Sequence, residues 1–174
     1  LAIFAFGGAS DITERIAATG LGREGIEAVR RMRDSNWLAG SITDCGSGQM
    51  CYRTWLTGPH DIAGTLAGRP ARLEFNPSSV GDKWALNYGS NDYRLRLVPG
   101  SAFAHSGSQD TIFFRKIFIF NQTAADPAAE TQILARVVVW WWGKNCSQVT
   151  NYNQPSDTNC KIVTEENLTN WKNY

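Results

Sequence analysis

The residues best suited to catalysis are sparse in this 174-residue chain. His60 and His105 are the two histidines, and no Gly-x-Ser-x-Gly elbow accompanies either of them. A hydrolase would have to use one of these histidines, and we interpret both as structural or solvated. Glu165 and Glu166 are adjacent in an extended segment, where neighbouring side chains point to opposite faces. We therefore expect neither an acid–base pair nor any other catalytic residue.

A glycine motif, Gly20-Leu-Gly22-Arg-Glu-Gly25, has the G-x-G-x-x-G spacing of a dinucleotide-binding loop. Such a loop requires a buried strand before it and a βαβ unit around it. Here the preceding residues, 11–19, are polar and helical in pattern, and the downstream sequence is rich in strands. We expect no cofactor, and we interpret the glycines as allowing close packing of a helix against a neighbour.

Four cysteines, Cys45, Cys51, Cys146 and Cys160, lie in polar segments rich in Gly, Ser, Asn and Thr. Their spacing lacks the C-x-x-C of a zinc or thioredoxin-like site, so we expect no metal. Of the three possible pairings, Cys45–Cys51 with Cys146–Cys160 is the simplest, and four reduced cysteines are the alternative. Disulfides would indicate an oxidising compartment.

Two further patterns concern the surface. Trp140, Trp141 and Trp142 end an apolar run, and strand alternation places Trp141 on the face opposite the other two. Packing in the core is the favoured interpretation, and contact with a ligand such as a sugar is the alternative. Asn-x-Ser/Thr patterns, which mark possible glycosylation, begin at three asparagines: Asn121, Asn145 and Asn167.

The composition limits the class of protein. Lys and Arg number 17 and Asp and Glu number 16, and 43% of the residues are hydrophobic. This balance argues against a dedicated nucleic-acid binder and against disorder. The pure apolar run at the start ends at Gly7-Gly8, far short of the roughly 18 residues of a membrane span.

The elements that would position these residues fall into two parts. Apolar residues recur at helical spacing between Asp11 and Leu38, with Ser10 or Asp11 as a cap and a break at Gly7-Gly8. After Gly40, short aromatic and β-branched runs alternate with turns. We predict strands at Ala71–Phe75, Tyr93–Val98, Thr111–Phe120, Gln132–Trp142 and Lys161–Thr164, and a short strand around Tyr52–Leu56.

Consecutive strands joined by short turns predict an antiparallel sheet, and such a sheet needs a cover for one apolar face. The helix is the only candidate cover. The sequence therefore predicts an α+β fold, a long N-terminal α-helix packed on an antiparallel β-sheet. Residues 1–38 would form the helix and residues 39–174 a globular β-rich head.

Several segments resemble bacterial type IV pilin-like proteins. The helical stretch 22–40, GREGIEAVRRMRDSNWLAG, is similar to the amphipathic half of the pilin N-terminal helix, and Leu1–Gly7 is similar to its apolar half. Phe114–Ile117, Val137–Trp142 and Leu168–Trp171 resemble strand and closing motifs of the same family. Residues 41–110 carry no recognised motif.

This resemblance implies a non-enzymatic subunit of an extracellular filament on a bacterial surface, which serves adhesion, motility or DNA uptake. Its partners would be copies of itself, other pilins and the assembly machinery, with an anchor in the inner membrane before assembly and no specific nucleic acid. A disulfide-closed C-terminal loop is common in the family, and Cys146–Cys160 fits it. The residues expected to pack in the filament core are Leu1, Ile3, Phe4, Phe6, Ile12, Ile16, Ile26 and Val29.

The chain also departs from the family pattern. The family carries a glutamate at the fifth mature position, where this chain has Ala5, so we expect Leu1 to lie partway into the family's apolar helix and the natural start to be missing. We also expect a non-helical segment near Gly7–Asp11. Two other functions stay open: a secreted carbohydrate-binding module with exposed tryptophans, and a hydrolase that uses His60 or His105.

Overall fold

The computed structural model describes residues 2–39, 55–56, 60, 62, 68–75, 83–98, 102–105, 107–122, 132–143, 145–146 and 159–170, with helix side chains from residue 11 to residue 38. These residues form one helix, α1 (Ala2–Ala39), and seven strands. The strands are β1 (Ala71–Phe75), β2 (Trp84–Tyr88), β3 (Arg94–Val98), β4 (Ala102–Ala104), β5 (Gln109–Asn121), β6 (Gln132–Trp141) and β7 (Lys161–Thr169).

All the strand pairs of the sheet are antiparallel, and β5 lies at its centre. With 13 residues, β5 is long enough to pair with β6 on one side and with both β3 and β1 on the other. The sheet continues from β6 to β7, from β1 to β2 and from β3 to β4. The pairing of β3 with β5 shifts register between Arg94 and Arg96, which marks a β-bulge.

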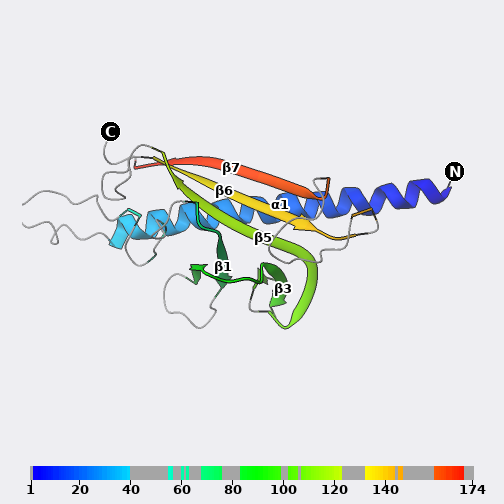
Figure 1. Cartoon of the computed structure of the whole chain (residues 1–174), viewed down its shortest axis with the longest axis horizontal. Coiled ribbons are helices and arrows are strands. Elements are labelled where there is room, and N and C mark those ends of the chain that lie inside the picture. Colours follow the sequence, from blue (N-terminus) through cyan, green and yellow to red (C-terminus); the bar gives the residue numbers. More distant parts are fainter. Residues whose placement is uncertain are drawn as a thin grey trace, which may run out of the picture.

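The helix runs along the long strands β5, β6 and β7, and its N-terminal end continues past the sheet (Figure 1). Alternate residues of the strands, including Ile117, Val137 and Val139, face the helix and are fully buried. From the helix, Val29 and Met32 fill the same core. Burial of each such side chain contributes about 1.5–3 kcal/mol, so this contact stabilises the fold strongly.

The predicted α+β class, with one helix on an antiparallel sheet, is confirmed. The predicted break is wrong, because α1 continues without interruption through Gly7, Gly8 and Asp11. Each glycine costs a helix only about 1 kcal/mol relative to alanine, whereas extending an existing helix is cooperative. The long helical segment that follows therefore carries the helix through both glycines, and no cap forms at Ser10.

The strand predictions hold for β1, β3, β5 and β6, with small shifts at the ends. Two strands were not predicted. The alternation of Trp84, Leu86 and Tyr88 was a usable signal for β2, whereas β4 has only three residues. β7 extends to Thr169 because β6 pairs with it along its whole length. Of the short strand predicted around Tyr52–Leu56, the described residues 55–56 form a bend instead, and the rest lies outside the described part of the chain.

Candidate functional site

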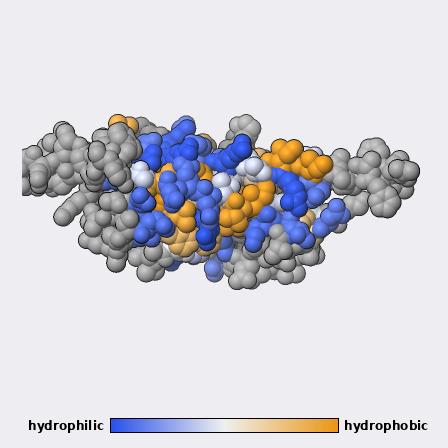
Figure 2. Space-filling model, turned by 90° about the horizontal axis from the view of Figure 1, so that it is seen from above, coloured by the Kyte–Doolittle hydropathy of each residue, from blue (hydrophilic) through white to orange (hydrophobic). Residues whose placement is uncertain are grey.

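The described β-branched apolar side chains of α1 form two groups, one buried and one exposed to solvent. Ile26 and Val29 are 4% and 0% exposed because they pack against the sheet. Ile12 and Ile16 are 59% and 67% exposed. Figure 2 shows a hydrophobic area toward one end of the described surface, apart from those nearer the middle of the molecule. The prediction that Ile26 and Val29 pack in a filament core is therefore wrong, since both belong to the chain's own core, whereas for Ile12 and Ile16 it stays a prediction.

The glycine motif brings the helix close to the sheet, as its interpretation predicted. A Cβ at Gly22 would lie 2.6 Å from Oγ1 of Thr164, and a Cβ at Gly25 would lie 2.9 Å from a methyl carbon of Val137. Gly20 has no such neighbour and faces solvent. Two of the three glycines are thus required by packing, which accounts for them without a cofactor.

The helix leaves the head near Arg15. The Arg15 guanidinium donates a hydrogen bond to the Asn159 carbonyl at 2.7 Å and lies 5.8 Å from the ring centroid of Trp141. A Cβ at Gly143 would meet the Glu14 carboxylate at 2.5 Å. These contacts join the helix to the start of β7 and the end of β6, so the exposed Ile12 and Ile16 flank the last anchoring point.

The side of α1 that faces away from the sheet carries exposed isoleucines before Gly20 and exposed charged residues after it. Arg23, Glu27 and Arg31 follow at intervals of four residues and are exposed. Arg30, beside them, forms ion pairs with Glu27 and with Glu166 of β7, the latter at 2.6 Å. Glu165 pairs instead with Arg136 on the opposite face of the sheet, which confirms that the two adjacent glutamates point in opposite directions.

A buried charge was missed by the sequence analysis. Arg115 of β5 is 0% exposed, pairs with Glu24 of the helix at 3.1 Å and donates to the Leu21 carbonyl at 3.2 Å. Burial lowers the pKa of Arg115, and the Glu24 carboxylate opposes that effect. A basic residue inside an apolar strand was the available signal. The pair sets the rotation of the helix on the sheet, because a shifted helix would leave a buried cation without its partner.

Cys146 and Cys160 form a disulfide with Cα atoms 5.9 Å apart, the pairing that the sequence favoured. Cys45 and Cys51 lie outside the described residues. Asp11 and Glu14 approach Cys146 closely enough to suggest a metal site. The sulfur of Cys146 is already in the disulfide, so it is not a metal ligand, and two carboxylates alone do not make the site.

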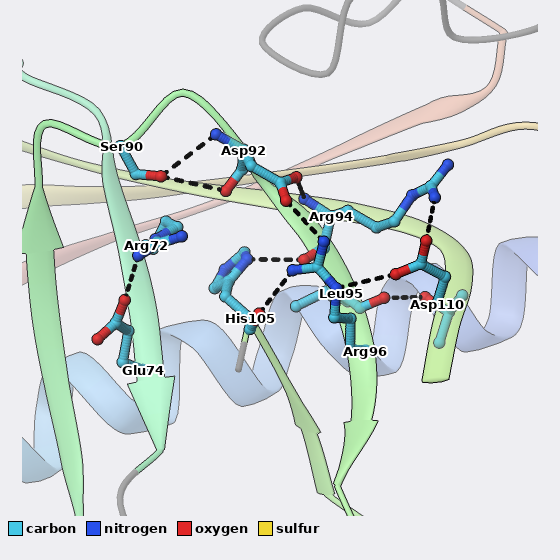
Figure 3. Close-up of polar contacts among 10 residues, drawn as sticks. Arg72, Glu74, Ser90, Asp92, Arg94, Leu95, Arg96, His105 and Asp110 are labelled. Atoms are coloured by element: carbon cyan, nitrogen blue, oxygen red, sulfur yellow. Dashed lines mark hydrogen bonds and ion pairs between the residues drawn. The ribbon is translucent and has the colours of Figure 1, made fainter. Parts of the chain in front are cut away.

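Charged groups gather around β3, where Arg96 pairs with Asp92 at 2.7 Å and with Asp110 at 2.8 Å, and Arg94 pairs with Asp110 at 2.5 Å (Figure 3). Burial raises the pKa of Asp92, but hydrogen bonds from Arg96 and from the Arg94 backbone outweigh burial, so the net shift is downward. Hydrogen bonds from Arg94 and Arg96 lower the pKa of Asp110. These pairs hold β3 and β5 together at the bulge.

His105 belongs to the same cluster and is only 3% exposed. Its Nδ1 lies 2.9 Å from the Arg94 carbonyl oxygen and must donate to it, because a carbonyl only accepts. Burial lowers the pKa of His105 to about 3, and Arg115 adds to the effect. A buried, neutral ring fits the structural interpretation. The backbone of His60 forms two hydrogen bonds with the side chain of Asn36: its N–H donates to Oδ1 and its carbonyl accepts from Nδ2.

The tryptophans do not form an exposed platform. Trp140 and Trp141 are each 1% exposed, on opposite faces of the sheet, and Trp142 is half-buried. The packing interpretation is thereby confirmed for Trp140 and Trp141, and the alternative that uses them as exposed sugar contacts is wrong. Among the possible glycosylation sites, Asn145 and Asn167 are exposed, whereas Asn121 is half-buried.

Within the described residues, no helix combines the length and the apolar character needed to cross a membrane. Comparison with known proteins finds no matching family model, no similar curated protein and no similar solved structure.

Proposed function

We propose that the chain is the structural subunit of a type IV pilin-like filament, in which copies associate through the N-terminal part of α1. The observation that carries the proposal is the exposure of Ile12 and Ile16 on a helix that continues beyond its own sheet. Covering an isoleucine contributes about 1.5–3 kcal/mol, and a helical assembly repeats this gain in every copy. The Leu1, Ile3, Phe4 and Phe6 positions stay part of this proposal, and their side chains lie outside the described ones.

The outward charges are compatible with such packing. Arg23, Glu27 and Arg31 alternate in sign along the helix, so neighbouring helices can place opposite charges together. The near-zero formal charge of +1 keeps repulsion between copies small. In this arrangement the β-rich head lies at the filament surface, outside the cell, and the anchor in the inner membrane before assembly rests on the resemblance alone.

The test compares filaments sheared from cells that express either the natural chain or the double variant Ile12→Asp/Ile16→Asp. We expect electron microscopy to show filaments for the natural chain and none for the variant, because two carboxylates per copy would enter an apolar contact. Val163→Asp, on an exposed position of β7, is the control and should leave filaments intact. Filaments from the double variant, or a natural chain found only as monomers, would refute the proposal.

A further inference from the structure

The face of the sheet opposite the helix carries a groove of about 440 Å³ over β5, β6 and β7. Register places Val138 between Lys116 of β5 and Val163 of β7. The next row along the strands consists of Phe118, Arg136 and Glu165. Because these residues alternate with those that face α1, their side chains all lie on the open side.

The floor of the groove is apolar and open to solvent. Val163 is 46% exposed, and Val138 and Phe118 are half-buried beside it. The Phe118 and Phe120 rings are nearly parallel, with centroids 6.1 Å apart. Such a surface offers an apolar face to a flat ligand, and its volume lies in the range of small-molecule sites, roughly 300–1,000 Å³.

The charges of the groove are unbalanced. Among the described residues that line it, Lys116, Arg136 and Lys161 are cationic and Glu165 is the one carboxylate. Arg136 pairs with Glu165, and the formal charges of the described lining residues sum to +2. Lys116 is held with its ammonium 4.5 Å from the Tyr93 ring centroid, and burial lowers its pKa. A partly desolvated ammonium interacts strongly with an anion that reaches it.

We propose that this groove binds an acidic oligosaccharide, with a sugar ring against Phe118 and the valines and a carboxylate near Lys116 and Lys161. Hydroxyl groups of a sugar donate and accept hydrogen bonds, and Glu165 supplies an acceptor for them. A DNA strand has no free sugar hydroxyl groups along its backbone, so it offers Glu165 fewer hydroxyl donors than a sugar ring does and fits the same lining less well. The site does not involve the outward face of α1 and is independent of assembly.

The binding test uses calorimetric titration of the purified chain with oligogalacturonate, with maltohexaose as a neutral sugar and a ten-residue oligothymidylate as the nucleic acid. We expect saturable binding of oligogalacturonate that weakens as salt rises. Maltohexaose should bind at least about tenfold more weakly, because it lacks the carboxylates. Failure of oligogalacturonate to bind, or tighter binding of the oligothymidylate, would overturn the proposal.

Matched variants locate the site. Lys161→Glu should weaken oligogalacturonate binding at least about tenfold. Lys83→Glu, which makes the same charge change at an exposed lysine outside the groove, should leave it within about twofold. Val163→Asp provides a second disruption at an exposed position, should Lys161→Glu fail to fold. Equal loss in the groove and control variants would contradict the assignment. Lys161→Glu should still form filaments, which separates this proposal from the proposed function.

Discussion

Ile16 and Ile26 are the same residue type on the same helix, yet one is 67% exposed and the other 4% exposed. The difference arises from the side of the helix on which each residue lies. Ile26 faces the sheet, whereas Ile16 lies on the outward side, which Arg23 and Glu27 continue. The comparison teaches that apolar spacing alone does not tell a chain's own core from a surface that copies of the chain can share. The covered part stabilises one copy, and the open part is available for assembly.

The largest expected effect comes from placing the same charge at each of the two isoleucines in turn. Ile26→Asp should cost more than about 5 kcal/mol of the free energy of unfolding, since it buries a carboxylate in the core. Ile16→Asp should change that free energy by no more than about 0.5 kcal/mol. Urea denaturation followed by circular dichroism measures both, and similar losses would show that Ile16 is also part of the core.

Removing the C-terminal disulfide should weaken the contact between Arg15 of the helix and the Asn159 carbonyl. Replacing Cys146 and Cys160 together by serine should cost about 3 kcal/mol of the free energy of unfolding, the value expected for a loop of this length. Hydrogen exchange should also rise near Arg15, because Asn159, its hydrogen-bond acceptor, lies next to the disulfide. Unchanged exchange at Arg15 would separate the disulfide from the helix anchor.

Acid should destabilise the head through His105. Its pKa is lowered in the folded chain to about 3, so below the ordinary pKa of 6.5 the unfolded state binds the proton first. Stability is therefore retained above pH 6.5 and lost as the pH falls, by about 2 kcal/mol between pH 6.5 and pH 5. His105→Gln should remove most of this slope when chemical denaturation is repeated across that range. An unchanged slope would contradict the buried, neutral ring.

Replacing two glycines of the same motif by alanine should change the free energy of unfolding in opposite directions. Gly25→Ala should cost about 1–2 kcal/mol, because its methyl group would press on Val137 in a packed core. Gly20→Ala should stabilise the chain by up to about 1 kcal/mol, since it improves helix propensity in open space. Thermal unfolding of both variants decides the point, and two shifts of the same sign would contradict the close approach at Gly25.

Much of the fold could be predicted because local pattern and tertiary packing agree. Helical spacing beyond Asp11 and strand alternation in β5 and β6 both follow from one apolar face per element. The start of the helix was misjudged, since propensity overstated the cost of Gly7 and Gly8 relative to helix cooperativity.

The candidate sites were harder to predict than the fold. Ile16 and Ile26 are ten residues apart and point in different directions around the helix, but the sequence alone does not show which direction faces the sheet. The groove around Val163 depends on the register of β5, β6 and β7, which brings Lys116 and Lys161 to one face from residues far apart in the chain. The Arg115–Glu24 pair joins positions 91 residues apart for the same reason.

The most direct test of assembly through the helix is a cryo-electron microscopy reconstruction of filaments formed by the natural chain. The account predicts that Ile12 and Ile16 contact neighbouring helices in the filament interior, while the sheet face around Val163 lies at the surface. A reconstruction in which both isoleucines face solvent, or in which the sheets rather than the helices join the copies, would contradict it.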